Sequence, residues 1–261
     1  MDPDNKVIAL EGRLKDCHNV VTLGVKTNFN QYSSVERHKI RQAEKIYYPS
    51  SFYAELFDTI GKKTFPSYHT YKFVQDKIKQ SALFDLLNIP HPRTRVYYGK
   101  RQKSRIPEHF NYPFIAKVPR GSALGRGVFL IHNSEELDRY LERSHPAYIQ
   151  EYHCIDRDIR VVVIGKRIVH AYWRLNPPHE FRSNVALGGR ISLDTIPEPA
   201  LALALHTARS CGWDDVGIDL CAGNGQYMVL EANMKYGKEG FRAAGINYSV
   251  LMERLIEDGD I

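Results

Sequence analysis

Cysteine is scarce in this sequence, and long apolar runs are missing. The four cysteines, Cys17, Cys154, Cys211 and Cys221, have no paired spacing, which argues against a disulfide framework or a zinc site and for a reducing compartment. No apolar run approaches the roughly 18–20 residues that span a bilayer. Residues 1–4 are acidic and begin no signal-peptide pattern. We therefore expect a cytoplasmic protein that does not contact a membrane.

Several common catalytic motifs are absent as well. The sequence holds no Gly-Lys-Ser/Thr phosphate loop, no dinucleotide-binding fingerprint, no nucleophile elbow and no His-Glu-x-x-His zinc motif. Its 11 histidines are dispersed and form no defensible nucleophilic pair with a cysteine. These absences leave no sign of serine or cysteine nucleophiles or of a zinc hydrolase.

The charge balance is basic but diffuse. Lys and Arg number 36 against 30 Asp and Glu, a net charge of +6, and no long basic run gathers them. A basic protein of this size binds nucleic acid or anionic small molecules. Its aromatic residues follow no RNA-binding motif, so anionic small molecules are the favoured partners.

The remaining composition is that of a globular protein. The 261 residues are 43% hydrophobic and 25% charged, which are ordinary values, and the length allows one large domain or two small ones. Short strand-like and helical segments over residues 6–66 suggest a small, irregular α/β region. Apolar residues at helical spacing over residues 71–88 predict the clearest helix. The segments as a whole predict an α+β (α/β) fold.

Residues 216–233 are the most informative part of the chain. Two short apolar runs flank Gly223-Asn224-Gly225, which predicts a β-hairpin. Side chains alternate between the two faces of a strand. One face is therefore predicted to be apolar, with Ile218, Leu220, Met228 and Leu230, and the other polar, with Asp219, Glu231 and Asn233.

Pairing of Asp219 with Glu231 places their Cβ atoms about 4.5–5.5 Å apart. Two opposed carboxylates repel unless something positive lies between them. Asp, Glu and Asn supply oxygen ligands, which suit Mg²⁺ and not Zn²⁺. A solvated polar face whose carboxylates pair with Lys or Arg is the alternative, and the hairpin alone favours neither.

A glycine-bearing loop follows a predicted strand at residues 114–118. Its N–H groups can form a nest for a phosphate, with Lys117 at the strand end before it. Glycine-rich turns and exposed strand-end lysines are common, so this signal is weak alone. Lys77 lies in the predicted helix 71–88, where a solvated helical face is the favoured interpretation.

Two further segments suggest ligand contacts. The backbone of Gln150-Glu151-Tyr152, at a strand end, can bond an adenine edge, although an ordinary sheet edge is at least as consistent. Arg160, Arg174 and Arg182 surround the polar loop at residues 175–190. Arginines clamp phosphate or carboxylate groups, and a surface salt-bridge set is equally consistent.

These pieces follow one another in a recognisable order. It is Lys77, Lys117 with its loop, Gln150-Glu151-Tyr152, Asp158-Ile159-Arg160, Arg182-Ser183-Asn184, Gly188-Gly189, Gly217-Ile218-Asp219 and Glu231-Ala232-Asn233. In this order the chain resembles the ATP-grasp superfamily, most closely the RimK-like ribosomal-protein glutamate ligases, over residues 70–257. No single element is specific, but together they are.

The resemblance implies an ATP-grasp fold, in which two α/β subdomains grip ATP, with a short N-terminal α/β region before them. It places the N-terminal region at residues 1–66 and the ATP-grasp domain at residues 67–261. The two subdomains are expected at about residues 67–150 and 151–261.

The resemblance also implies a role for each candidate residue. Lys77 is expected at the ATP phosphates and Lys117 at the phosphates or at adenine. Glu151 and Tyr152 are expected at adenine beside Gln150, and Asp158 at the ribose. The glycine loop contributes Gly121, Ser122, Gly125 and Gly127. Arg182, Ser183 and Asn184 hold the transferring phosphate, and Arg174, Arg182 and Asn184 are the expected catalytic residues. Asp219, Glu231 and Asn233 bind Mg²⁺, with Mn²⁺ as an alternative metal.

The implied reaction is ATP-dependent carboxylate–amine ligation through an acyl phosphate. Positioning and charge stabilisation carry such catalysis, and the loops at residues 121–127 and 175–190 are expected to close over ATP and exclude water. ATP and a small amino acid such as glutamate are the expected substrates. A protein or peptide acceptor and a homo-oligomer remain open.

Two departures from the family concern the acceptor. The family usually carries small residues and Pro after Glu-x-Asn, whereas Lys235 and Lys238 stand here, and we expect them to bind an anionic substrate. The first 66 residues look short for the usual N-terminal domain. Ligation on an amino-acid carrier protein and a non-catalytic nucleotide sensor are therefore kept as alternatives, with RNA binding a distant one.

Overall fold

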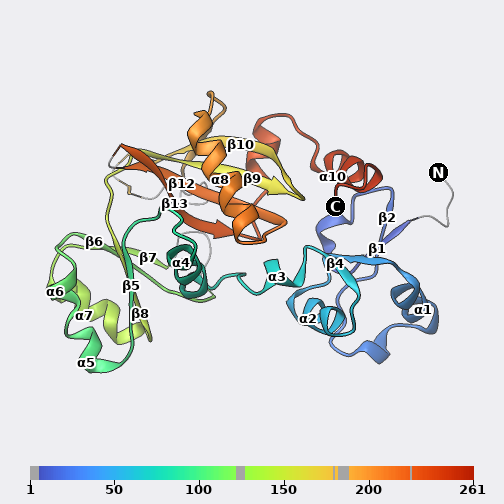
Figure 1. The fold of residues 1–261 in the computed structure, drawn as a ribbon, viewed down its shortest axis with the longest axis horizontal. Coiled ribbons are helices and arrows are strands. Elements are labelled where there is room, and N and C mark those ends of the chain that lie inside the picture. Colours follow the sequence, from blue (N-terminus) through green and yellow to red (C-terminus); the bar gives the residue numbers. More distant parts are fainter. Residues whose placement is uncertain (1–5, 122–126, 179, 182–187, 224) are drawn as a thin grey trace.

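Residues 7–65 contain a parallel sheet (Figure 1). The structure is a computed structural model that describes residues 6–121, 127–178, 180–181, 188–223 and 225–261. Its first sheet has the order β2-β1-β3-β4. The strands are β1 (Val7–Ala9), β2 (Val20–Thr22), β3 (Lys45–Tyr47) and β4 (Lys63–Phe65), and the helices are η2 (Gly12–Leu14), η3 (Phe29–Gln31), α1 (Ser34–Gln42) and α2 (Ser51–Thr59). This part of the chain is a regular sheet, so the expected irregular region is wrong in that respect.

A second, antiparallel sheet has the order β5-β8-β6-β7. Two helices, α3 (Tyr68–Tyr71) and α4 (Lys77–Leu86), precede it. Its strands are β5 (Thr94–Tyr97), β6 (Phe114–Lys117), β7 (Val128–Ile131) and β8 (Ala147–Glu151), accompanied by the helices α5 (Gly99–Lys103), α6 (Ile106–His109) and α7 (Ser134–Arg143). Figure 1 shows α5, α6 and α7 together on the far side of the sheet from α8.

The third sheet is the largest, with the antiparallel order β11-β10-β9-β12-β13. Its strands are β9 (Arg157–Ile164), β10 (Arg167–Leu175), β11 (Arg190–Ser192), β12 (Asp215–Gly223) and β13 (Gln226–Asn233). The helix α8 (Glu198–Ser210) lies before β12, and α9 (Glu239–Ala243) and α10 (Tyr248–Glu257) close the chain. β9 and β10 form a hairpin around Gly165-Lys166.

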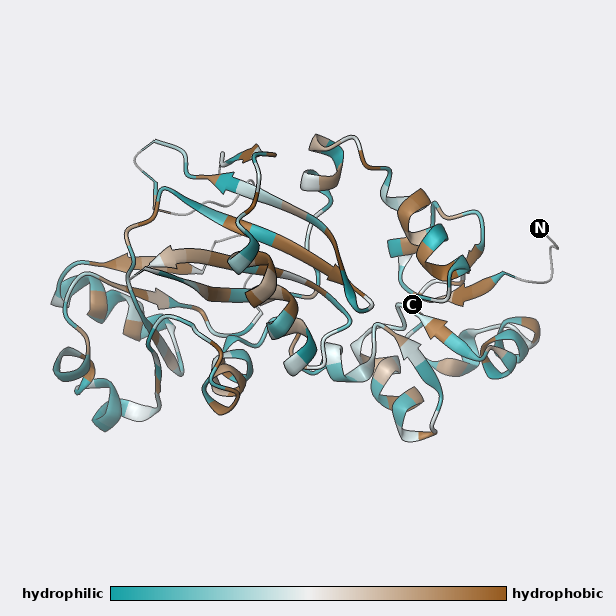
Figure 2. Ribbon diagram, turned by 45° about the horizontal axis from the view of Figure 1, so that its top comes forward, coloured by the Kyte–Doolittle hydropathy of each residue, from teal (hydrophilic) through white to brown (hydrophobic). Residues whose placement is uncertain are grey.

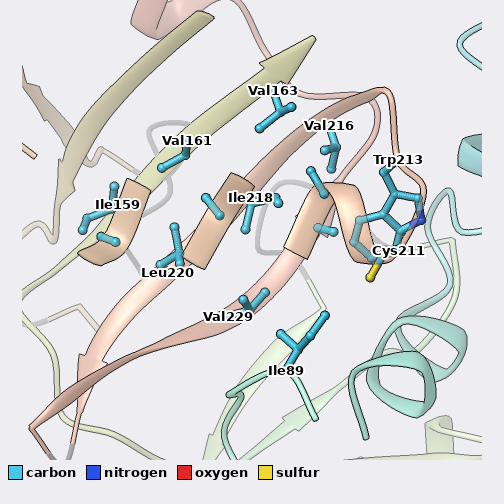
Figure 3. Packing of buried hydrophobic residues seen from close by; sticks show 14 of the residues in the cluster. Ile89, Ile159, Val161, Val163, Cys211, Trp213, Val216, Ile218, Leu220 and Val229 are labelled. Atoms are coloured by element: carbon cyan, nitrogen blue, oxygen red, sulfur yellow. The ribbon is translucent and has the colours of Figure 1, made fainter. Parts of the chain in front are cut away.

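Strand alternation gives the large sheet two different faces. Ile159, Val161 and Val163 of β9 lie in one apolar cluster with Ile218 of β12 and the alanines of α8 (Figure 3). Burial of these side chains holds α8 against the sheet. The residues between them on β9, among them Asp158 and Arg160, therefore lie on the opposite face.

A second apolar cluster joins the N-terminal sheet to the end of the chain. Leu14 and Tyr47 pack with Ile164 of β9 and with Met252 and Leu255 of α10. Figure 2 shows long brown stretches along several strands and much teal on the helices at the lower left. This cluster holds the N-terminal sheet against the large sheet. Residues from both sheets can therefore line one site.

The helix expected at residues 71–88 is broken near its start. α4 begins at Lys77, Gln75 adopts a left-handed φ of 54°, and the Asp76 side chain caps the helix by accepting from Lys79 N at 3.1 Å. The apolar spacing continues across this break, which is why periodicity alone predicted one helix.

The predicted limit at residue 66 falls between two sheets, whereas the one between residues 150 and 151 separates the last residue of β8 from the rest of that strand. Residue 66 follows β4, and residue 151 is the last of β8, but the division into domains stays a prediction. In the described part of the chain, no helix has the length and apolar character needed to cross a bilayer.

Candidate active site

The hairpin of β12 and β13 brings the three predicted metal ligands together. Asp219 pairs with Glu231, and Gly217 pairs with Asn233, so the predicted register is confirmed at this end of the hairpin. The register shifts by one residue at Leu230, because Leu220 pairs with Val229.

The bulge changes which side chains enter the core. Val229 is fully buried in the cluster under α8, whereas Met228 pairs with Cys221 on the face that carries Asp219. The predicted apolar face was therefore wrong for Met228 and Leu230, although right for Ile218 and Leu220. A bulge re-aims the strand that contains it, and here that strand carries Glu231 and Asn233.

Asp219 is buried and surrounded by hydrogen-bond donors. Arg160 binds both of its carboxylate oxygens, with Nη2 at 2.9 Å from Oδ2. Arg174 Nη2 lies 3.0 Å from the same Oδ2, and Asn233 Nδ2 donates to it at 3.0 Å. Burial opposes ionisation of Asp219, but the two guanidinium groups outweigh it and hold its pKa below the usual value.

Arg174 is shared between two carboxylates. Its Nε and Nη2 bind Asp158 Oδ1 and Oδ2, each at 2.7 Å, in a bidentate pair across β9 and β10. Burial raises the pKa of Asp158 despite this pair. The structure thus shows Asp158 holding Arg174, and its role at the ribose stays a prediction.

Gly217 makes room for Arg160. A Cβ atom at Gly217 would lie 2.9 Å from Arg160 Cδ and 3.0 Å from Tyr236 Cβ. Both distances are shorter than carbon atoms accept without a shift. This explains why a glycine stands two residues before Asp219 on the same face.

Lys77 reaches Glu231 from the first residue of α4. Its Nζ lies 3.5 Å from Glu231 Oε1, and its side chain is only 6% exposed. The backbone N–H of Lys77 donates to Pro119 O at 3.0 Å, which ties the start of α4 to the segment after β6. The solvated helical face that the sequence favoured for Lys77 is therefore wrong.

Lys117 ends β6 and is buried beside the same charges. Burial lowers the pKa of Lys117 to about 8, although the nearby carboxylates of Glu231 and Asp219 act in the opposite direction. After it, Val118 N bonds to Gly127 O at 2.7 Å, and Gly121, with a φ of 65°, donates to Gln75 O at 3.3 Å. The ends of the glycine loop are thus fixed beside α4.

Gln80 is a site residue that sequence reasoning missed. Its Nε2 donates to Ala232 O at 2.9 Å, and its Oε1 accepts from Ala232 N at 3.1 Å. Ala232 stands between Glu231 and Asn233 on the outer strand of the sheet. The sequence shows a glutamine about one helical turn after Lys77, but it does not show that this side chain is buried.

The predicted adenine segment connects the two antiparallel sheets. β8 ends at Glu151, whose N–H donates to Arg93 O at 2.8 Å. The buried side chain of Gln150 donates to Thr94 Oγ1 at 3.0 Å. β8 pairs with both β5 and β6, so Gln150 lies inside the sheet and not at an ordinary edge. Tyr152 follows in the connection to β9.

Some predicted residues lie outside the described residues. They are Ser122 and Gly125 of the glycine loop and Arg182, Ser183 and Asn184 of the polar loop.

Positive charge exceeds negative charge at this face. Among the described residues, Lys77, Lys117, Arg160 and Arg174 supply four cationic groups, and Asp158, Asp219 and Glu231 supply three carboxylates. The alternative of carboxylates paired with Lys or Arg therefore describes the ion pairs correctly, but the face is buried. One unbalanced cation favours an anionic ligand such as a phosphate.

The donor set also fits a magnesium ion bound together with phosphates. Within the described ranges, no group of three or more His, Cys, Asp or Glu side chains forms a metal cage. Mg²⁺ does not require one, because one or two carboxylates plus substrate phosphates suffice. Asp219 and Glu231 supply the two carboxylates, and Asn233 directs its amide nitrogen toward Asp219 and its oxygen away from it.

Lysines from α4 and β6 thus meet carboxylates from the large antiparallel sheet. This arrangement of two antiparallel sheets is that of an ATP-grasp protein, and the fold comparison agrees. The ATP-grasp ligase PsnB, solved with a minimal precursor, superposes with a TM-score of 0.71 at 17% identity, covering 97% of this chain and 98% of that chain.

Sequence comparison is more specific. The model of the RimK-like ATP-grasp domain matches residues 74–256, and the chain therefore belongs to the RimK-like ATP-grasp family.

The curated relatives are longer proteins. Beta-citrylglutamate synthase B of Danio rerio is 32% identical over 165 residues, which cover 60% of this chain and 40% of the relative. The ribosomal protein bS6–L-glutamate ligase of Escherichia fergusonii is 29% identical over 191 residues, covering 70% of this chain and 63% of the relative. The chain thus matches less than two thirds of either protein.

Proposed function

We propose that this chain is an ATP- and Mg²⁺-dependent carboxylate–amine ligase that takes an amino acid such as glutamate as a substrate. The observation that supports this most directly is the set of buried Lys77, Lys117, Arg174 and Asp219 with the partly buried Glu231, in which lysines and carboxylates from separate elements face one another. Relatives in the family are named glutamate ligases.

The reaction has two balanced steps. A carboxylate oxygen of the first substrate attacks the γ-phosphorus of ATP, and the bond to the bridging oxygen breaks, which releases ADP and leaves an acyl phosphate. The amine of the second substrate then attacks the acyl carbon. The C–N bond forms, the C–O bond to phosphate breaks, and the amine loses a proton.

The residues act mainly through charge. Lys77 and Lys117 bind phosphate oxygens, since both are buried cations at the ends of α4 and β6. Arg174 is shared by Asp158 and Asp219, so a phosphate that competes for its guanidinium removes one of the three donors that bind Asp219 Oδ2. Mg²⁺, held by Asp219, Glu231 and Asn233, supplies neutralisation of the phosphates when bound. Repulsion between a carboxylate and ATP is thereby reduced.

The test is ADP release by the purified chain with Mg²⁺ and ATP, across a panel of amino acids and small carboxylic acids. We expect one acid or amine to stimulate release, and Glu231→Gln to abolish that stimulation while folding normally. Glu44→Gln, at an exposed ion pair in the N-terminal sheet, is the matched control and keeps full activity. Nucleotide binding without stimulated release in any mixture would favour a nucleotide sensor instead.

A further inference from the structure

A cavity of about 110 Å³ lies at one end of the N-terminal parallel sheet. Glu11 comes after β1, Tyr48 follows β3 and Pro66 follows β4, and all three line the cavity. These strands are parallel, so their carboxyl ends meet at one edge. That edge is where ligands bind in open α/β sheets.

The opposite wall belongs to the candidate active site. Met234 and Lys235 line the cavity and directly follow Asn233. Val74, three residues before Lys77, lines it as well. The cavity therefore touches the N-terminal sheet on one side and, on the other, the two segments that carry a metal ligand and a phosphate-binding lysine.

Two residues that line the cavity, Glu11 and Lys235, form an ion pair that a ligand can replace. Glu11 Oε1 lies 3.2 Å from Lys235 Nζ, and the Lys235 side chain is 52% exposed. An ion pair this exposed adds little to stability. A ligand that carries both charges can therefore replace it, with an ammonium at Glu11 and a carboxylate at Lys235.

Arg13 brings a second cation to the same cavity. Its Nη1 donates to Tyr236 O and its Nε to Tyr248 Oη, each at 3.0 Å, and its guanidinium lies 4.4 Å from the centroid of the Tyr236 ring. Its Nη2 is buried and has no hydrogen-bond partner within the described part of the chain. Because Nη2 has no accessible surface, Arg13 acts on a ligand in the cavity through its positive charge, which favours a carboxylate there.

We propose that this cavity is the amino-acid pocket of the ligase, in which Glu11 binds the substrate ammonium, Lys235 binds a carboxylate, and Arg13 adds positive charge to the lining. This assignment rests on the proposed function. The lining carries two cations and one carboxylate, so its charge complements an amino acid with an acidic side chain. The ligand is thus a zwitterion whose binding opens the Glu11–Lys235 pair.

Calorimetric binding of L-glutamate to the full chain, with Mg²⁺ and a non-hydrolysable ATP analogue present, tests this assignment. Glu11→Gln and Lys235→Met should each raise the dissociation constant about tenfold or more, the effect of losing one charge-assisted contact. Glutarate has both carboxylates but no ammonium. Its affinity should fall in Lys235→Met but should not fall in Glu11→Gln, where Lys235 no longer pairs with a carboxylate.

An equivalent surface ion pair provides the control. Glu44 and Lys63 lie 3.2 Å apart in the same sheet, outside the cavity, and Glu44→Gln and Lys63→Met should bind L-glutamate as the unmodified chain does. The pocket assignment is overturned if Glu11→Gln binds L-glutamate as tightly as the unmodified chain does. It is also overturned if the unmodified chain binds the nucleotide analogue but not L-glutamate. Failure of the unmodified chain to bind the analogue overturns the proposed function instead.

Discussion

The side-chain amide of Gln80 pairs with the backbone of Ala232 as a neighbouring strand would, donating to its carbonyl at 2.9 Å and accepting from its N–H at 3.1 Å. β13 is the outer strand of its sheet, and Glu231 and Asn233 flank Ala232. The helix that supplies Lys77 to Glu231 therefore also fixes the backbone between the two expected metal ligands.

Gln80→Leu removes both bonds, together with the bond that Nε2 donates to Phe73 O at 3.0 Å, at nearly constant volume. Two buried backbone groups then lack partners, at a cost of about 1–3 kcal/mol each, so we expect the free energy of unfolding to fall by about 2–4 kcal/mol in denaturant titrations. The concentration of Mg²⁺ that gives half-maximal ADP release should rise. Gln42→Leu, an exposed glutamine at the end of α1, should change neither quantity. An unchanged Mg²⁺ dependence in Gln80→Leu would limit Gln80 to a structural role.

Gly217→Ala tests the close approach of Arg160. The new methyl would lie 2.9 Å from Arg160 Cδ, so the guanidinium has to move and its pairing with Asp219 weakens. We expect the kcat for ADP release to fall about tenfold or more, because Asp219 loses the partner that orients it. Gly12→Ala is the control, since no atom lies within 4 Å of its added Cβ. Full activity in Gly217→Ala would show that the orientation of Arg160 is unimportant.

The sequence and the structure agree where local rules decide and differ where distant segments meet. Alternation and the glycine turn were enough to pair Asp219 with Glu231. The bulge at Leu230 was not predictable, because the outer edge of β13 is shaped by partners from elsewhere in the chain, including Pro90 O, which accepts from Val229 N at 2.8 Å. Gln80 was missed for the same reason.

Charge pairing was equally beyond sequence reasoning. Asp158 and Arg174 are 16 residues apart and become a bidentate pair only because β9 and β10 align them. Similarly, Lys77 looked solvated because its helix pattern gives no sign of the large sheet that buries it.

The buried lysine at the end of β6 predicts a pH dependence. The pKa of Lys117 is lowered to about 8 by burial, so the side chain is charged below that pH and becomes neutral above it. The kcat/KM for ATP reports groups of the free enzyme and should therefore fall as the pH rises through about 8. Lys117→Arg keeps its charge at every accessible pH, and its profile should lose this basic limb. If kcat/KM of Lys117→Arg falls over the same pH range, a group other than Lys117 causes the fall.

Asp215 predicts a pH dependence of stability with the opposite sign to that of an ordinary ion-paired carboxylate. It is fully buried, accepts hydrogen bonds from Tyr48 Oη at 2.8 Å and Tyr236 Oη at 2.6 Å, and joins the N-terminal sheet to β12. Burial raises its pKa from 3.8 to about 6, although Arg13 opposes the shift. The folded state therefore binds the proton more tightly than the unfolded state does. This group costs stability above about pH 6, and the cost disappears as the pH falls toward 4.

Asp215→Asn removes this titration. The free energy of unfolding of the unmodified chain, minus that of the variant, should increase as the pH falls from 6 to 4. One pKa unit corresponds to about 1.4 kcal/mol, so the full shift amounts to about 3 kcal/mol, of which about 2 kcal/mol should appear between pH 6 and 4. Denaturant titrations at several pH values measure it, and Asp58→Asn, an exposed aspartate on α2, should show a constant difference. A constant difference for Asp215→Asn as well would mean that Asp215 stays ionised across this range, held by Arg13 and the two tyrosine hydroxyls more strongly than burial opposes it.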